Sequence, residues 1–268
     1  MKDTGKAVGF TYDEQNLNYK LVWSDEFDYT GAPDPKKWVY DVGGHGWGNN
    51  EMQYYTEGKN VKVENGRMII EARREDVENR EVTSTRIKTA GKGDWLYGKI
   101  EVSAKIPKGL GTWPAIWMLP TGWEYGGWPK SGEIDIMEHV GYDEDVIVTS
   151  IHSETYHHSI QTEKNASKLL KGATDGFHVY AVEWLPDKIK FFVDGELWFM
   201  YTPSDYSNEP ATYKEWPFDK PFHLIINLAF GGFWGAAKGV DMDLFPITYE
   251  IDYVRVYQSE EINKLVGN

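Results

Sequence analysis

The chain has 268 residues, 41% of them hydrophobic and 15% aromatic, which is enough for a large core and fits the size of one all-β domain. Its 42 acidic and 28 basic residues give a formal net charge of -14, which disfavours nucleic acid, membrane surfaces and strongly anionic polysaccharides as partners but not a neutral polysaccharide. The absence of cysteine excludes disulfides, thiolate catalysis and Cys-ligated zinc.

The ends of the chain carry no clear targeting signal. No apolar run approaches the ~20 residues of a membrane span, and the start, MKDTGKAVGF, lacks the apolar core of a signal peptide. The residues alone therefore indicate either a cytoplasmic protein or a mature form whose leader was removed. We expect residues 1–268 to form a single domain with its core at about 21–258.

Short β-rich segments recur along the chain, separated by Gly, Pro, Asn and Asp. In chain order they are residues 20–27, 67–75, 97–107, 145–153, 177–185, 188–195, 221–230 and 249–258. Within 97–107, Ile100, Val102 and Ala104 alternate with polar residues, which is the pattern of a strand with one buried face. Segment 177–185 carries large side chains on both faces, which is typical of a strand that buries one face and lines a groove with the other.

Two further local signals complete the predicted elements. TEKNASKLLKG (162–172) is the only segment predicted to form a short helix, with Gly172 ending it. Asp194-Gly195 predicts a tight hairpin turn. Because strands do not alternate with helices, an α/β fold is disfavoured, and the pattern predicts an all-β, two-sheet sandwich.

Three loops rich in glycine and aromatics, 43–56, 120–132 and 230–239, cannot easily bury their backbones and are expected to rim a site. Indole faces stack on neutral sugar rings, while polar neighbours bond the hydroxyls. Core packing accounts for any single tryptophan at least as well, but the whole set favours a sugar-binding groove. The candidates are Trp47, Trp113, Trp117, Trp123, Trp128 and Trp234.

Several residues near these loops are candidate sugar ligands. Trp113 and Trp117 are four residues apart and so share a strand face. Arg73 lies on a polar strand face, where it either bonds sugar hydroxyls or pairs with Glu71. His152 would lie near the acidic segment at 132–141 if their two strands are neighbours.

The segment GEIDIMEHVG (132–141) carries three acids. In a regular strand Glu133 and Asp135 point one way and Glu138 the other. A β-bulge at Ile136 and Met137 would turn Glu138 onto the face of the other two acids. The glutamates would then be four strand steps apart, roughly 13 Å between Cα atoms, and inward-leaning carboxyls would end about 5 Å apart, as in a retaining glycosidase. Spacing does not decide which glutamate is the nucleophile and which is the acid/base.

The same acids would also suit a solvent-facing acidic strand or a divalent-metal site with oxygen ligands. The aromatic loops favour a glycosidase over both. A non-catalytic sugar-binding module and a hydrolase of another neutral polysaccharide, such as agarose, stay open as alternatives.

These motifs carry a family resemblance. At GEIDIMEHVG, joined with GTWPAIWMLP, GWGNNEMQYYT, WSDEFD and IDYVRVYQ, the chain resembles the bacterial endo-β-1,3-glucanases, or laminarinases, of glycoside hydrolase family 16, over about Leu21 to Gln258. The resemblance implies a β-jelly-roll sandwich with a concave substrate cleft and a retaining mechanism without a cofactor.

The resemblance also implies roles for particular residues. Glu133 would be the nucleophile, Asp135 its assistant and Glu138 the acid/base. The substrate-binding positions carried over are Asn49, Arg73, Trp113, Trp117 and His152. The ExDxxE form, with Met137 as the extra residue, is similar to laminarinases and to agar- and carrageenan-cleaving relatives, whereas lichenases use ExDxE. The net charge and the GWGNNEMQYYT loop favour β-1,3-glucan, with mixed-linkage glucan not excluded.

Many members of the family hold a structural calcium on the convex side. The matching positions are Glu26, Gly66 and Asp252, and backbone carbonyls supply much of such a site. Members are usually secreted, which is the location that the resemblance implies here. We expect a monomer.

Overall fold

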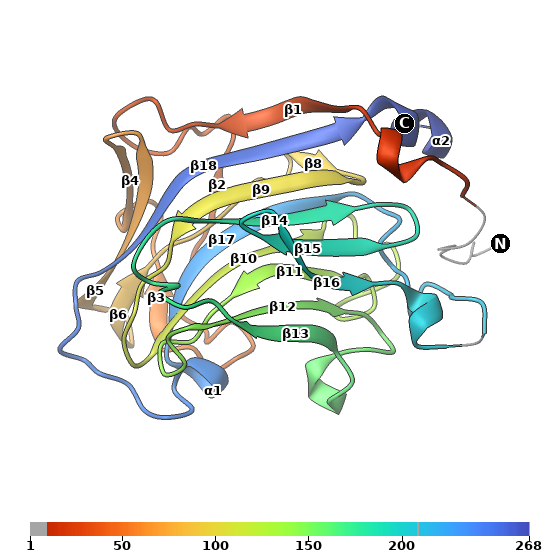
Figure 1. Cartoon of the computed structure of the whole chain (residues 1–268). Coiled ribbons are helices and arrows are strands. Elements are labelled where there is room, and N and C mark those ends of the chain that lie inside the picture. The colour runs from red at the N-terminus through yellow and green to blue at the C-terminus, as the bar shows by residue number, and fades with distance from the viewer. Residues whose placement is uncertain (1–9, 208, 268) are drawn as a thin grey trace.

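The computed structural model describes residues 10–207 and 209–267, and these form two β-sheets packed face to face (Figure 1). The start of the chain, on which the signal-peptide prediction rests, lies largely outside the described residues. The ten-stranded sheet contains β1 (Tyr19–Asp25), β3 (Gln53–Tyr55), β4 (Val61–Glu64), β5 (Arg67–Val77), β6 (Arg80–Ser84), β9 (Gly98–Lys105), β14 (His178–Trp184), β15 (Ile189–Val193), β16 (Glu196–Tyr201) and β18 (Ile247–Ser259). The eight-stranded sheet contains β2 (Val39–Asp41), β7 (Arg86–Lys88), β8 (Asp94–Trp95), β10 (Thr112–Pro120), β11 (Glu133–Glu138), β12 (Val146–His152), β13 (Lys164–Leu169) and β17 (Phe222–Phe230).

Helices are short and lie outside the two sheets. They are η1 (Glu14–Asn16), η2 (His158–Ile160), η3 (Pro203–Asp205), α1 (Gly232–Gly235) and α2 (Glu260–Val266). No helix of the described residues is long and apolar enough to span a membrane. Within residues 10–207 and 209–267, strand pairs are antiparallel except for β3 with β6. The predicted all-β, two-sheet sandwich is therefore confirmed.

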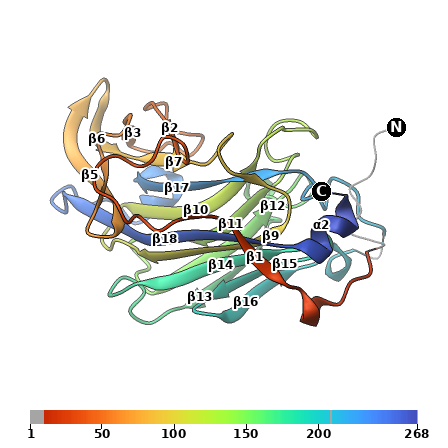
Figure 2. The same cartoon turned by 90° about the horizontal axis from the view of Figure 1, so that it is seen from above.

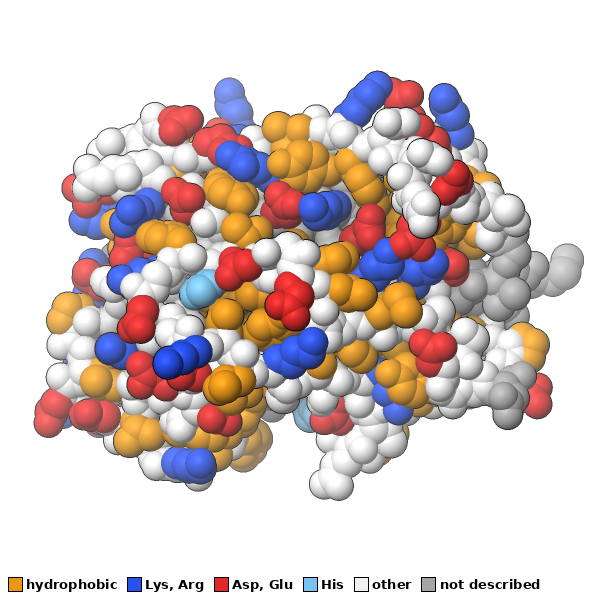
Figure 3. Space-filling model, in the orientation of Figure 1, with side chains coloured by type: hydrophobic (Ala, Val, Ile, Leu, Met, Phe, Trp, Pro, Cys, Tyr) orange, Lys and Arg blue, Asp and Glu red, His pale blue; other side chains and the backbone are white. Residues whose placement is uncertain are grey.

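The core lies between the sheets, whose two layers are clear when the molecule is seen from above (Figure 2). Inward positions alternate along the strands as the sequence predicts, and Ile100, Val102 and Ala104 of β9 are fully buried. The layers meet through aromatic contacts, such as Trp184 of β14 against Phe222 of β17, with ring centroids 5.2 Å apart. On the face shown in Figure 3, acidic and basic side chains are interspersed, with hydrophobic ones between them.

The hairpin prediction is confirmed. Asp194 and Gly195 join β15 to β16 with φ angles of 50° and 80°, the left-handed conformations that a two-residue hairpin turn of this kind requires. The sequence pattern predicts a groove-lining strand at 177–185, but β14 lies in the ten-stranded sheet between β9 and β15. The three acids of segment 132–141 lie on the eight-stranded sheet instead.

The predicted helix at 162–172 is wrong. Residues Lys164–Leu169 form β13, paired antiparallel with β12 from Val146 opposite Leu169 to Ile151 opposite Lys164. Side chains along β13 alternate between half-buried and exposed, as on an edge strand. Helix propensities differ by at most about 0.7 kcal/mol per ordinary residue, so pairing with the exposed edge of β12 outweighs the helical preference of Ala, Lys and Leu.

Candidate active site

The three acids lie on a bulged strand in the middle of the eight-stranded sheet. Asp135 lies opposite Ser150 of β12, and Glu138 lies opposite Val148, so two residues of β11 face the single Thr149. The predicted bulge is confirmed. On the β10 side Met137 pairs with Ile116, and Ile136 has no partner, so the extra residue is Ile136 rather than Met137.

The bulge separates the strand into a core face and an outer face. Ile134, Ile136 and Met137 are fully buried in the core. Glu133 and Glu138 are half-buried, and Asp135 is buried at the outer face. The charges of Asp135 and Glu133 both raise the pKa of Glu138. This electrostatic effect supports the prediction that the three acids lie close together.

Each carboxyl group receives one hydrogen bond from a neutral donor. Trp128 Nε1 donates to Glu133 Oε2 over 2.9 Å. Trp113 Nε1 donates to Glu138 Oε1 over 3.2 Å. Ser150 Oγ donates to Asp135 Oδ2 over 2.7 Å. The donors orient the acids without neutralising them with a full positive charge.

His152 lies next to the acids, as predicted for a neighbouring strand. It is opposite Glu133 in the β11–β12 pair. Its Nε2 is 3.1 Å from Asp135 Oδ2 and 3.7 Å from Glu133 Oε1. Burial lowers the pKa of His152, but contact with Asp135 and the charge of Glu138 outweigh burial and raise it overall.

The two glutamates have strongly perturbed acidities. Burial, and then the charge of Asp135, raises the pKa of Glu133 well above its usual value. Burial, followed by the charges of Asp135 and Glu133, does the same for the pKa of Glu138. Carboxyls this close cannot all ionise together, so the group retains a proton at pH values where isolated acids have lost theirs. A retained proton is what a general acid needs.

Aromatic side chains flank the acids along β10. Trp113 and Trp117 are both half-buried and on the same face, as predicted. Trp234 of α1 contacts Trp113 edge to face, with ring centroids 5.4 Å apart. The Arg86 guanidinium lies 4.7 Å from the Trp117 ring and 4.8 Å from the Trp47 ring.

The predicted ligand Asn49 belongs to a buried polar cluster around Glu51. Asn49 Nδ2 donates to Glu51 Oε1 over 3.2 Å. Gln53 Nε2 and Tyr55 Oη donate to Glu51 Oε2 over 2.6 and 3.2 Å. Glu51 is 5% exposed, and burial raises its pKa. The cluster fixes the loop 43–56 beside the loop 230–239, where Phe233 N bonds to Asn49 O.

The hydrogen bonds of this cluster continue to Trp117. Asn227 Nδ2 donates to Tyr55 Oη over 3.0 Å, and Trp117 Nε1 donates to Asn227 Oδ1 over 2.7 Å. A chain of hydrogen bonds therefore runs from Glu51 to Trp117. It sets the orientation of the Trp117 indole.

Arg73 lies apart from these contacts. Its Nε is 2.6 Å from Glu71 Oε1, and its Nη1 donates to the carbonyl of Lys59 over 3.1 Å. The pairing with Glu71 that the sequence left open is thus present. A role for Arg73 in binding sugar stays a prediction.

Sequence reasoning missed four residues of the site: Ser150, Asn227, Glu51 and Arg86. Ser150 could have been found, because it lies two positions before His152 and so shares its strand face. Asn227 is the lone amide in the apolar run PFHLIINLAF, which is also a signal. Glu51 and Arg86 carry no comparable signal.

Of the positions expected to hold calcium, Asp252 lies on β18 of the ten-stranded sheet, Glu26 directly follows β1, and Gly66 lies in the turn between β4 and β5. The register pairs Asp25 with Val254 and Ile251 with Met68, so the segments carrying Glu26, Gly66 and Asp252 come close together. However, the Glu26 carboxylate already receives two hydrogen bonds from Arg255, of 2.9 and 2.7 Å. Among the described residues, the hydrogen-bond partner of the Asp252 carboxylate is Ser103 Oγ, at 3.3 Å. The donors that fit a cation are therefore the Asp252 carboxylate and the backbone carbonyls.

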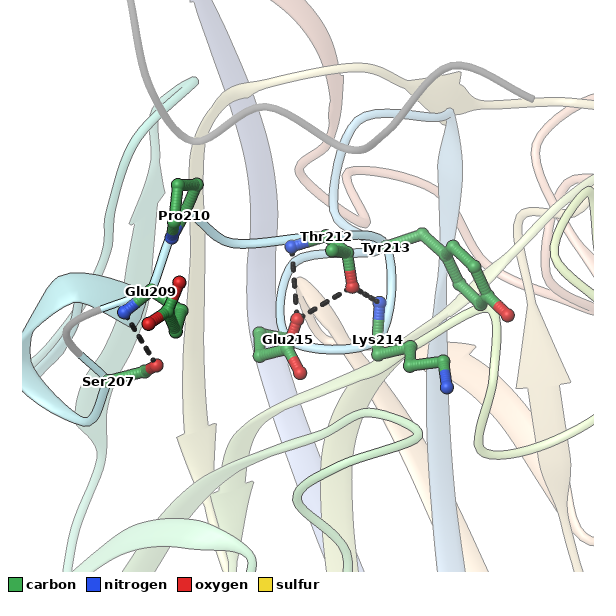
Figure 4. A pocket seen from close by; sticks show the side chains of 7 residues that line it. All are labelled: Ser207, Glu209, Pro210, Thr212, Tyr213, Lys214 and Glu215. Atoms are coloured by element: carbon green, nitrogen blue, oxygen red, sulfur yellow. Dashed lines mark hydrogen bonds between the residues drawn. The ribbon is translucent and has the colours of Figure 1, made fainter. Parts of the chain in front are cut away.

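Two hollows lie away from the acids. One lies between β16 and β17 in sequence and is lined by Ser207, Glu209, Pro210, Thr212, Tyr213, Lys214 and Glu215 (Figure 4). Its polar groups bond to one another, since Glu215 accepts from Thr212 and Ser207 accepts from Glu209 N. The other, at the β5–β6 turn, is lined by Arg74, Glu75, Asp76 and Glu81. Neither contains the convergent acids and aromatics of β10 and β11.

The family model of the glycosyl hydrolases family 16 matches residues 48–255. The chain belongs to this family. The chain is therefore a glycoside hydrolase, and its sandwich is the jelly-roll fold of the family. The family assignment agrees with the resemblance of the acidic strand.

Individual members of family 16 are also similar. A beta-glucanase of Rhodothermus marinus is 52% identical over 94% of this chain and 89% of its own length. The structure of the laminarinase from the same organism superposes with a TM-score of 0.88 over 91% of this chain and 99% of that one. A glucan endo-1,3-beta-glucosidase A1 of Niallia circulans is 36% identical over 95% of this chain, which spans 40% of that protein. SCLam, a non-specific endo-beta-1,3(4)-glucanase, superposes with a TM-score of 0.85 at 42% identity, over 96% of each chain.

Proposed function

We propose that the chain is an endo-acting, retaining β-1,3-glucanase that cuts neutral, laminarin-like glucans, with mixed-linkage β-1,3-1,4-glucans as a second substrate class. The observation that carries the proposal is the bulged strand, which brings Glu133, Asp135 and Glu138 together at the outer face of the sheet. Support for the substrate class comes from the similar laminarinase and from the similar endo-beta-1,3(4)-glucanase.

In the mechanism, Glu133 attacks the anomeric carbon while Glu138 protonates the leaving oxygen. Glu138 then removes a proton from the water that hydrolyses the glycosyl-enzyme intermediate. Asp135, held by Ser150, keeps the proton of the acidic group available by opposing full ionisation. No cofactor takes part in these steps.

Substrate recognition follows from the surroundings of the acids. Trp113 and Trp117 offer indole faces for sugar rings, and Asn49 offers an amide. The charge of Arg86 is paired with Asp41, with Nε 2.9 Å from Oδ2. Because the site gathers three acids around the reacting bond while this cation is already paired, a neutral polymer suits the cleft better than a sulfated one.

The first test measures reducing-end release from laminarin, lichenan, agarose and carrageenan side by side. We expect release from laminarin first, lichenan second and neither galactan. Glu133→Gln should lose more than about 10³-fold of the rate, because nucleophilic attack is lost. Sugar binding with no release by the wild type would instead favour the non-catalytic sandwich.

A second test assigns the two glutamates. With an activated aryl glucoside and azide, Glu133→Ala should yield the α-glucosyl azide, because azide replaces the missing nucleophile. Glu138→Ala should yield the β-product, because azide then intercepts the covalent intermediate. The opposite pair of products would exchange the two roles.

We further propose a structural calcium bound by the Asp252 carboxylate and the backbone carbonyls of Glu26 and Gly66. A bound cation would stabilise the folded state by mass action. Millimolar calcium should therefore raise the melting temperature of the wild type but not of Asp252→Asn. Equal shifts in both proteins would remove Asp252 from the site.

The proposed enzyme is a monomer that acts outside the cytoplasm, because a glucan polymer cannot cross a membrane to reach it. Light scattering should give the mass of one chain, 30.8 kDa. Fractionation of the source cells should place the activity outside the cytoplasm. A stable dimer or a cytoplasmic activity would overturn the corresponding statement.

A further inference from the structure

The nucleophile end of the cleft has a second chemical feature, a cluster of metal-binding atoms. One ligand atom each from Glu133, Asp135 and His152 lies within 4.8 Å of the other two. The group differs from a simple acidic cluster because it contains a buried imidazole, 5% exposed, whose Nε2 lies near both carboxylates. Asp135 is also buried, at 2% exposure.

The spacing of these atoms suits a small transition-metal ion. Zinc binds nitrogen and oxygen ligands at about 2.0–2.2 Å, so two ligands of a tetrahedral ion lie roughly 3.4 Å apart. The distances from His152 Nε2, 3.1 Å to Asp135 and 3.7 Å to Glu133, lie on either side of this value. Calcium, which takes six to eight oxygens at longer distances, fits a mixed set of this size poorly.

A second imidazole is close by. His158 of η2 has its ring centroid 5.3 Å from that of His152, with the rings at 87°. Two imidazoles bound to one tetrahedral zinc place their centroids roughly 5 Å apart. His158 is exposed and takes no part in the hydrolytic mechanism described above.

We propose that His152, His158, Asp135 and Glu133 form a zinc-binding site whose occupation reversibly blocks hydrolysis. Hydrolysis would be blocked because the ion would bind the carboxylate that must attack the anomeric carbon. The inhibitory effect therefore rests on the proposed function, whereas zinc binding itself does not. His152 Nδ1 has no hydrogen-bond partner among the described residues. A hydrogen-bond partner on the second ring nitrogen of a metal-binding histidine typically adds 10- to 100-fold to the metal affinity. Because His152 lacks this contribution within the described part of the chain, we expect zinc binding of micromolar rather than nanomolar strength.

The test measures binding and inhibition separately on the whole chain in excess calcium, so that oxygen-ligand sites are already filled. Zinc chloride is titrated by calorimetry, and reducing-end release from laminarin is followed at the same free zinc concentrations. We expect one zinc per chain and inhibition with the same midpoint, reversed by a chelator that prefers zinc to calcium. Cobalt(II) should give the intense visible absorption of a tetrahedral site.

His158→Ala is the informative variant, because an exposed residue can be replaced without loss of the fold. It should keep its uninhibited rate and lose about 10- to 100-fold in zinc affinity. The matched control is His178→Ala, since His178 also contacts a carboxylate, with Nδ1 2.7 Å from Asp194 Oδ2, but lies on the other sheet. It should bind zinc as the wild type does.

The outcomes separate the two proposals. No zinc bound at submillimolar concentration, or equal affinity in His158→Ala and the wild type, would overturn the site. Zinc binding that depends on His158, in a chain that hydrolyses none of the four polysaccharides, would keep the site and reject the proposed activity.

Discussion

The extra residue Ile136 allows a direct test of how the site is built. Deleting it removes the residue between Asp135 and Met137 that has no partner on β10, and leaves Glu133, Asp135 and Glu138 at alternate positions of a regular strand. All three acids then still lie on the outer face of the sheet. By contrast, deleting both Ile136 and Met137 leaves Glu138 three positions after Glu133 and so turns it toward the core face, where Ile134 is fully buried.

The expected magnitudes follow from burial. Deletion of Ile136 removes a side chain that is 0% exposed, which costs about 3 kcal/mol of the free energy of unfolding. For a domain of this size the melting temperature falls by roughly 6 to 12 °C. Because the two glutamates stay about four strand steps apart, we expect at least about one-hundredth of the wild-type rate, the loss typical of a 1 Å misplacement.

The assay is reducing-end release from laminarin at about 20 °C below each variant's own melting temperature, with Glu138→Gln as the inactive reference. The variant that lacks both Ile136 and Met137 should fall to the level of that reference. The reasoning is refuted if the variant that lacks only Ile136 folds but is as inactive as Glu138→Gln, or if the variant that lacks both Ile136 and Met137 keeps the wild-type rate.

Three further predictions concern neighbouring groups. Trp113→Phe removes a hydrogen bond that lowers the pKa of Glu138, so the alkaline limb of kcat/KM should move up by roughly one pH unit; a limb that stays in place would contradict the role of Glu138 as general acid. Tyr55→Phe removes a hydroxyl that bonds two buried groups and should lower the free energy of unfolding in urea by about 1–3 kcal/mol, whereas an unchanged value would show that the chain of hydrogen bonds carries no stability. Burial lowers the pKa of His223 to about 4, so from about pH 6.5 down to about pH 4 the unfolded chain binds a proton that the folded one excludes, and the free energy of unfolding falls by about 3 kcal/mol. His223→Gln should lack this fall, and parallel curves for the two proteins would disprove it.

The bulge in the acidic strand could be predicted because side chains of a regular strand alternate strictly between its two faces. The apolar residues of GEIDIMEHVG fix one face to the core, so a third acid at Glu138 can join the other two only through an inserted residue. His152 followed from the same logic, because consecutive strands are often neighbours. Both predictions depend only on side-chain alternation along one strand and on the pairing of consecutive strands.

The remaining features depend on which distant segments meet. Arg86 lies between Trp47 and Trp117 because β7 pairs with β17, which in turn pairs with β10, and no local pattern encodes those pairings. The error at 162–172 has the same origin. Its residues suit a helix in isolation, but the open edge of β12 supplies hydrogen-bond partners that local propensity does not include.

The contacts that hold Trp117 come from strands, whereas Trp128, which donates to Glu133, comes from the connection between β10 and β11. Ordering a side chain on binding costs free energy, and a side chain already held in place has lost that freedom during folding. The Trp117 side and the Trp128 side of the three acids should therefore differ in how much variation in a bound sugar they tolerate. Sugars that meet Trp117 encounter a preformed surface that rejects misfits, whereas those that meet Trp128 can be accommodated by small adjustments of a loop.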